Sequence, residues 1–341
     1  MIRRILAAAL TVCLALVLLV AAWPQLFRLE WTFGIAQVVS LRGAAIAIGA
    51  ICALVLLVVA LLSARARRLA ASLTLLFLVF CAVGLMVLST RGFGGGAMSA
   101  ATGDVGKRDL TVLSWNTLGD APGAKAIARL ALKSGADIVT LPETTTATGI
   151  EVARIMGEAG HPMWAFTNHF DEVSKSRSTT LLLSADLGTY SVDQSRGNTS
   201  VLPTVVATPD DGKGPIIVAT HPVAPITGEM DHWRSDLTWL SGICSGKNVI
   251  MAGDFNSTLD HLGRLKATGD ADFGSCYDAA RAAGTGAVGT WPTSVPPLLG
   301  TPIDHVMTTS NWRVRSMHVV VDSDSAGSDH RPIVATITPS Q

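Results

Sequence analysis

The chain has 341 residues, enough for two or three folded units, with 26 basic and 26 acidic residues. The zero net charge is unevenly distributed: residues 1–108 hold ten basic and two acidic residues, whereas residues 109–341 hold sixteen basic and twenty-four acidic ones. The resulting charge of −8 on the C-terminal part argues against binding of long nucleic acids through a broadly basic surface. All eight histidines also lie in the C-terminal part, so side chains suited to chemistry are concentrated there.

The N-terminal part contains three apolar runs without an acidic or basic side chain, at residues 5–23, 43–63 and 69–89. Each is close to the roughly 20 residues that a membrane-spanning helix needs. We therefore predict three transmembrane helices within residues 1–89. The first run also fits a cleavable export signal, because "MIRR" precedes it. Trp23 and Pro24 make a poor cleavage site, which favours a retained span.

Basic residues in short loops favour the cytoplasmic side of a membrane. Two groups of them flank the spans on one side: Arg3 and Arg4 before the first, and Arg65, Arg67 and Arg68 between the second and third. On the other side lie Arg28 and Arg42, whose charge is diluted by Glu30, and two possible interface anchors, Trp23 and Trp31. The larger groups predict a multi-pass protein of the cell membrane whose C-terminal domain is extracytoplasmic.

Residues 90–108 are rich in Gly, Ala and Ser and have no hydrophobic period, which predicts a flexible linker. A coil of this length spans on the order of 20 to 25 Å, so the following domain, residues 109–341, is expected to stay close to the membrane. In that domain Cys244 and Cys276 form an even pair, and we predict that they are disulfide-bonded, because disulfides persist outside the cytoplasm.

From residue 109 onward, short β-rich runs alternate with helical ones. Strands are predicted at residues 110–116, 137–143, 179–185, 201–209, 215–222, 248–256, 303–309, 315–321 and 332–338. Helices are predicted at residues 123–134, 149–159, 230–243 and 278–283. About nine strands are too many for one simple sheet. Two sheets packed face to face with helices outside them are the expected arrangement.

Many of the predicted strands end in a polar residue, a pattern typical of sites built on rigid scaffolds. These residues are Asn116, Glu143, His221, Asp254 with Asn256, and Asp304, while Asp329 and His330 directly precede the last strand. In "VIMAGDFNS" the apolar strand ends in an acid and an amide two positions apart, which places both on one face. Taken alone, this pair also fits a turn in which Asp and Asn bond their own backbone.

The motifs "SWN", "PE", "THP", "GDFN", "PIDHV" and "SDHRP" occur in this order, and together they resemble the endonuclease/exonuclease/phosphatase superfamily. The resemblance covers residues 110–339. It implies a four-layer α/β/β/α sandwich preceded by the three transmembrane helices. It also implies a metal-dependent phosphoesterase, and a ligand set of oxygen atoms without thiolates suits Mg²⁺ or Mn²⁺.

The resemblance also implies roles for single residues. Glu143 is the expected principal metal ligand, with Asn116 beside it and Asp329 completing the metal or water network. Asp254 and Asn256 are expected to orient the attacking water and bind the scissile phosphate. His330, held by Asp304, matches the general base or phosphate-polarising group, and His221 matches the histidine that protonates the leaving oxygen. Which histidine is the acid and which the base stays open.

Two further residues are candidates for substrate contact. Trp291 lies in a Pro-rich loop just before Asp304, and Arg234 lies on the helix after "THPVAP", where a solvated helix charge is the alternative. The sequence departs from the family near residues 175–184. Arg177, Ser178 and Thr179 stand where some relatives place a carboxylate that supports the second histidine, so His221 is expected to lack that partner.

These observations predict a membrane-anchored, extracytoplasmic, divalent-metal-dependent phosphodiesterase or nuclease-like hydrolase. Nucleic acid, a phospholipid headgroup and a small phosphodiester are the candidate substrates, and nothing in the sequence predicts a protein partner. The alternative is a catalytically inactive domain that binds a phosphorylated ligand and serves as a membrane sensor or assembly module.

Overall fold

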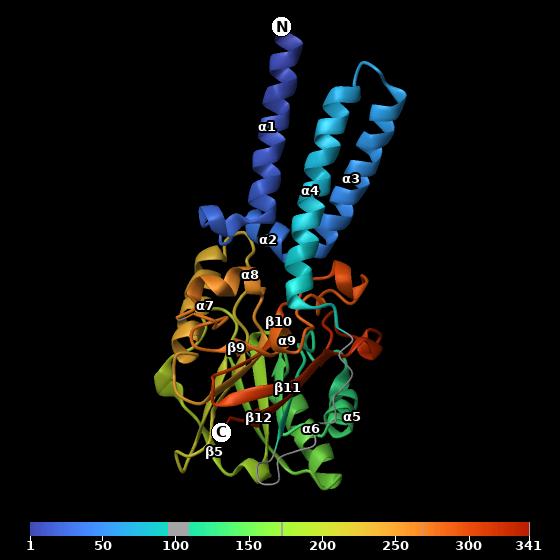
Figure 1. Ribbon diagram of the computed structural model, residues 1–341. Coiled ribbons are helices and arrows are strands. Elements are labelled where there is room, and N and C mark those ends of the chain that lie inside the picture. The colour runs from blue at the N-terminus through green and yellow to red at the C-terminus, as the bar shows by residue number, and fades with distance from the viewer. Residues whose placement is uncertain (95–108, 172, 268, 341) are drawn as a thin grey trace.

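The computed structural model describes residues 1–94, 109–171, 173–267 and 269–340. Three long helices stand on one end of an α/β sandwich (Figure 1). They are α1 (Ile2–Ala22), α3 (Arg42–Leu62) and α4 (Arg67–Arg91), and all three are long and apolar enough to cross a membrane. The N-terminus and the turn between α3 and α4 lie at the end of this bundle that is remote from the sandwich.

The sandwich contains two six-stranded sheets. The first has the strand order β11 (Trp312–Val319), β12 (Ile333–Pro339), β1 (Leu110–Ser114), β2 (Ile138–Pro142), β4 (Ser178–Ser184), β3 (Met163–His169). The second has the order β5 (Tyr190–Val192), β6 (Val205–Pro209), β7 (Ile216–Thr220), β8 (Val249–Asp254), β10 (Asp304–Thr308), β9 (Tyr277–Asp278). Among the described strands, the sequence analysis did not predict β3, β5 and β9, and each of these lies at the edge of a sheet.

Apolar side chains fill the space between the two sheets and the space between each sheet and the helices that cover it. Val112 and Ile138 of the first sheet meet Ile217 and Ile250 of the second in the central core. Helices cover the outer faces: α5 (Gly123–Ser134) and α6 (Thr146–Glu158) pack on the first sheet, and α7 (Met230–Ile243) packs on the second. Two short helices, α8 (Leu259–Leu262) and α9 (Ala279–Ala282), complete the domain. The predicted four-layer α/β/β/α sandwich is confirmed.

The segment between α1 and α3, which includes α2 (Ile35–Ser40), packs on the sandwich. Trp31, expected at the membrane interface, lies against Trp233 of α7 with ring centroids 5.6 Å apart. Arg42, expected to be a loop charge, is buried and forms a 2.9 Å ion pair with Asp260 of α8. The sequence interpretation missed these contacts because each partner lies about 200 residues away in the chain.

The predicted linker falls largely outside the described residues. Thr90 and Arg91 form the end of α4, and residues 95–108 are not described. The division into residues 1–89, 90–108 and 109–341 therefore stays a prediction. Cys244 and Cys276 are joined by a disulfide with their Cα atoms 5.7 Å apart, and both side chains are buried at the C-terminal end of α7.

Candidate active site

Strand direction brings the polar residues to one edge of the sandwich. In the first sheet β1 and β2 are parallel, so Asn116 and Glu143 follow their carboxyl ends side by side. In the second sheet β7 and β8 are parallel and β10 runs antiparallel to β8, which places Asp304 opposite Asp254 in register. His221 follows β7 at the same edge.

Asn116 links the two sheets at this edge. Its side-chain amide lies 3.1 Å from Oε1 of Glu143 and 3.1 Å from Oδ2 of Asp254. Glu143 has a positive φ of 57°, which a glutamate adopts only under constraint from its surroundings. Such strained residues cluster at functional sites, so the conformation supports a functional role for Glu143.

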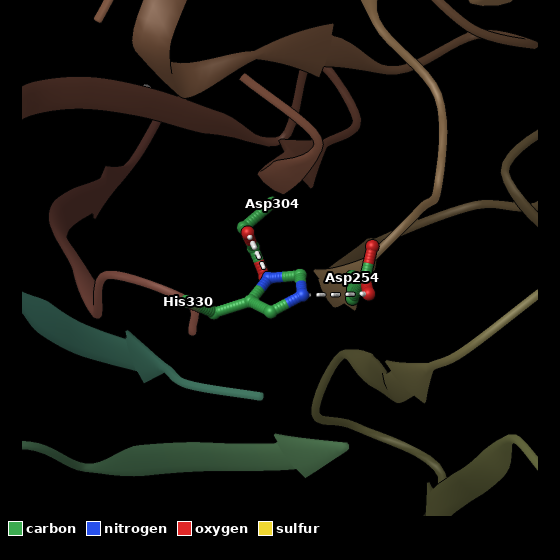
Figure 2. Close-up of side chains that lie close together, drawn as sticks. All are labelled: Asp254, Asp304 and His330. Carbon is green, nitrogen blue, oxygen red and sulfur yellow. Dashed lines mark hydrogen bonds and ion pairs between the residues drawn. The ribbon is translucent and has the colours of Figure 1, made fainter. Parts of the chain in front are cut away.

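His330 lies between two buried carboxylates (Figure 2). Its Nδ1 is 2.9 Å from Oδ2 of Asp304, and its Nε2 is 3.6 Å from Oδ2 of Asp254. Two residues that the sequence interpretation missed hold the backbone here. Trp115 donates its indole N–H to the His330 carbonyl, and the Ser328 hydroxyl accepts the His330 backbone N–H. The sequence signal for these two residues was their position inside the motifs "SWN" and "SDHRP".

The two histidines differ in charge. Burial alone would lower the pKa of His330, but Asp304 and Asp254 outweigh it and raise this pKa to about 10. Burial and the charge of His330 lower the pKa of His221 to about 3. At neutral pH, His330 is therefore the protonated ring and His221 the neutral one. Nδ1 of His221 has no hydrogen-bond partner among the described residues, in line with the missing carboxylate near Thr179.

Asn256 and Asp254 form the turn that the sequence left as an alternative, and they also belong to the site. Oδ1 of Asp254 accepts the backbone N–H of Asn256 at 2.7 Å, while Oδ2 faces Asn116 and His330. The Asn256 amide donates to the Pro222 carbonyl at 3.0 Å. One carboxylate thus fixes the loop with one oxygen and offers the other to the site.

The remaining candidates divide into two groups. Asp329 lies at the site, and its Oδ2 accepts the indole N–H of Trp291 at 2.8 Å, which brings both residues to this edge. Arg234 is not brought there. Its guanidinium donates to the Trp31 carbonyl and to Asp231, so it helps hold the segment between α1 and α3.

Buried acidic side chains gather around His330, and a cluster of this kind can hold a metal ion. Asp254, Asp304 and His330 place ligand atoms within 4.8 Å of one another, but a protonated His330 has no lone pair to give a metal, so the carboxylates are the groups that can bind one. Oδ1 of Asp304 and Oδ1 of Asp329 are buried without a partner among the described residues. Burial raises the pKa of Glu143, against the hydrogen bond from Asn116. Each pair of carboxylates at 4 Å repels by about 4 kcal/mol at an effective dielectric constant of 20, a cost that a hard cation removes.

The comparisons agree with this geometry. The model of the endonuclease/exonuclease/phosphatase family matches residues 113–330, and the chain belongs to this family. Members of the family are typically hydrolases of phosphoesters that use divalent metals. A search of curated proteins returned no match.

Solved structures share the fold at low sequence identity. An endonuclease/exonuclease/phosphatase from Beutenbergia cavernae is 19% identical with a TM-score of 0.52, and the match covers 68% of this chain and 72% of that one. One from Bacteroides vulgatus is 18% identical with a TM-score of 0.52, covering 69% and 100%. TDP2 from D. rerio, solved with a single-strand DNA product, is 18% identical with a TM-score of 0.50, covering 67% and 98%.

Proposed function

We propose that this chain is a membrane-anchored phosphoesterase that hydrolyses a phosphodiester outside the cytoplasm with Mg²⁺ or Mn²⁺. The observation that carries the proposal is the position of His330 between Asp304 and Asp254, next to the pair formed by Glu143 and Asn116. Phosphoester hydrolysis needs positive charge at the phosphoryl oxygens and an acceptor for the proton of the attacking water. The cluster contains groups suited to both.

Each side chain has a role in the proposed reaction. His330, kept protonated by Asp304, donates to a phosphoryl oxygen and neutralises charge there. Asp254 orients the attacking water and takes its proton, because burial and the charge of Asp304, against that of His330, raise the pKa of Asp254 to about 7, close to neutral pH. Asn256 contacts the phosphate beside it. His221, neutral at this pH, lies 3.9 Å from Asp254, and its ring N–H donates a hydrogen bond to the leaving oxygen. The P–O bond to that oxygen breaks as the bond to the water oxygen forms, and the leaving oxygen takes up a proton from solvent.

The donor atoms fit a divalent cation. Glu143, Asn116 and Asp329 are the residues proposed to hold it, and Oδ1 of Asp329 is available for this role. When bound, the cation supplies positive charge that stabilises the developing charge on the phosphoryl group. The absence of thiolate ligands in this set favours Mg²⁺ or Mn²⁺ over Zn²⁺.

The arrangement of the helices supports an extracytoplasmic active site. Arg3 and Arg4 begin α1 and Arg67 and Arg68 begin α4, which places these charges at the end of the bundle remote from the sandwich (Figure 1). Basic residues favour the cytoplasm, so the sandwich belongs on the opposite side. The disulfide favours the same side. Alkaline phosphatase fused after the C-terminus is expected to be active, whereas an inactive fusion would reverse the orientation.

Metal-dependent turnover tests the activity directly. The full chain in detergent is incubated with bis-p-nitrophenyl phosphate in the presence of Mg²⁺, Mn²⁺ or EDTA. Release of nitrophenol with either metal and none with EDTA is expected. If no phosphodiester in a panel of DNA, RNA and phospholipids is hydrolysed under these conditions, the proposal fails and the alternative of a domain that binds a phosphorylated ligand without turnover is favoured.

A further inference from the structure

A cavity of about 840 Å³ lies where the helix bundle meets the sandwich. Ala22 at the end of α1 and Val83 and Val87 of α4 form its apolar wall. Asp260 and Arg264 line it from the sandwich. The volume falls in the range of roughly 300–1,000 Å³ that small-molecule sites occupy. Neither the His330 cluster nor its neighbours line this cavity, so it is a separate site built jointly by the two parts of the chain.

Positive charge dominates the polar wall of the cavity. Four arginines and two acids line it: Arg28, Arg42, Arg91 and Arg264, with Glu30 and Asp260. Arg42 and Arg91 share one oxygen of Asp260, at 2.9 and 2.8 Å. Arg264 pairs with Glu30 at 3.1 Å. The exposed guanidinium of Arg28 forms no hydrogen bond or ion pair within the described ranges, and two positive charges are left in excess.

Three buried polar atoms on these residues have no partner among the residues that the structure describes. They are Nε of Arg42, Oδ2 of Asp260 and Oε2 of Glu30, on residues that are 5%, 6% and 3% exposed. An N–H of Arg42 requires an acceptor, and phosphate oxygens suit it best. The two carboxylate oxygens require donors, which hydroxyl groups provide. A phosphodiester that also carries hydroxyl groups offers the acceptor and the donors that these three atoms lack.

The side chains on one face of α4 indicate how a ligand is oriented in the cavity. Val83, Val87 and Arg91 follow one another at intervals of four residues, so they lie on one face of the helix. This face is apolar at Val83 and Val87 and charged at Arg91, the last residue of α4. That end of α4 reaches the sandwich (Figure 1). A ligand that follows it has an apolar part on the membrane side and an anionic part beside Asp260. This is the polarity of a phospholipid in the leaflet next to the sandwich.

We propose that this junction cavity binds one anionic phospholipid with a hydroxyl-bearing headgroup. Its phosphate contacts Arg28 and the free Nε of Arg42, its headgroup hydroxyls donate to Glu30 and Asp260, and its acyl chains lie along α4. The bound lipid then joins the catalytic domain to the spanning helices. The inference depends on the membrane placement of the helices and is independent of turnover at His330.

Lipid binding to the full chain tests the proposal. Delipidated protein in detergent is titrated with dioctanoyl phosphatidylglycerol, dioctanoyl phosphatidylcholine and glycerol 3-phosphate, and binding is measured by native mass spectrometry and isothermal titration calorimetry. Phosphatidylglycerol is expected to bind at least ~10-fold more tightly than either of the others. Equal affinity for phosphatidylcholine would show that the site does not recognise the negative charge of the lipid. Equal affinity for glycerol 3-phosphate would show an anion site that does not recognise acyl chains. Either result would overturn the proposal.

Matched arginine variants localise the binding. Arg28→Gln and Arg91→Gln are each expected to weaken phosphatidylglycerol binding ~10-fold. Arg68→Gln, an exposed arginine at the other end of α4, is expected to leave it unchanged. Arg28 is exposed and its guanidinium forms no hydrogen bond or ion pair with the described residues, so its variant decides the question if Arg91→Gln fails to fold. Wild-type affinity in Arg28→Gln would overturn the proposal whatever the protein hydrolyses.

Discussion

Asp254 and Asp304 are register partners in neighbouring antiparallel strands, and they hold His330 between them, one carboxylate at each ring nitrogen (Figure 2). The pairing depends on β8 and β10 being adjacent, although the two residues are 50 positions apart. A backbone ladder therefore sets the distance between the two carboxylates. The charge state of His330 follows from this arrangement.

Asp304→Asn is expected to lower turnover by roughly 10²- to 10⁴-fold while the protein stays folded. The amide cannot stabilise a protonated His330 as the carboxylate does, so the pKa of His330 falls and the pH profile of turnover shifts to lower pH. Asp322→Asn, an exposed acid outside the site, serves as the control. An unchanged pH profile in Asp304→Asn would show that this contact does not set the charge of His330.

Glu143→Gln is expected to reduce affinity for Mn²⁺ by at least ~10-fold, because one charged ligand is replaced by a neutral one. Titration followed by electron paramagnetic resonance measures the free Mn²⁺. The melting temperature without metal is expected to match or exceed that of the wild type, since burial disfavours the charged form of Glu143. Glu151→Gln on the exposed face of α6 is the control, and equal Mn²⁺ affinity in both variants would remove Glu143 from the ligand set.

Asp260→Asn is expected to destabilise the full chain by roughly 3–5 kcal/mol, because two arginines in the junction lose their shared partner. Thermal unfolding in detergent measures the change. Asp231→Asn serves as the matched control, since its carboxylate is 96% exposed and pairs only at the surface. A melting temperature equal to that of the wild type would show that the junction contributes nothing to stability.

The same residue predicts a pH dependence. Burial alone would raise the pKa of Asp260, but Arg91 and Arg42 hold it well below its usual range. The stabilisation by Asp260 is therefore fully present above its ordinary value of about 3.9 and is lost as the pH falls toward the lowered pKa. The stability difference between the wild type and Asp260→Asn is expected to shrink in that acidic window and to be constant from pH 6 to 8.

Replacement of Cys244 and Cys276 by Ser is expected to lower the free energy of unfolding by roughly 3–4 kcal/mol. The disulfide closes a loop with a sequence separation of 32 residues, and opening it restores conformational freedom to the unfolded chain. The melting temperature of the double variant is compared with that of the oxidised and the reduced wild type. Equal melting temperatures of the reduced and the oxidised wild type would show that the bond is not formed in the purified protein.

Much of the fold was predictable because its signals are local. The spanning helices and the strands β1, β2, β7, β8 and β10 are apolar runs with clear ends, and the polar residues that follow them mark one edge of the sandwich. Edge strand β3 was missed because most of its side chains are only partly buried and it lacks such an apolar run. The junction was missed for another reason. The contacts of Trp31 with Trp233 and of Arg42 with Asp260 join residues about 200 positions apart, and no local pattern encodes them.

The most direct test of the central claim compares two histidine variants of the full chain. Hydrolysis of bis-p-nitrophenyl phosphate with Mg²⁺ is measured for the wild type, for His330→Ala and for His318→Ala, which alters an exposed histidine of β11. Metal-dependent hydrolysis is expected to fall at least ~100-fold in His330→Ala and to stay at the wild-type rate in His318→Ala. A folded His330→Ala variant that hydrolyses the substrate at the wild-type rate would contradict the assignment of the active site.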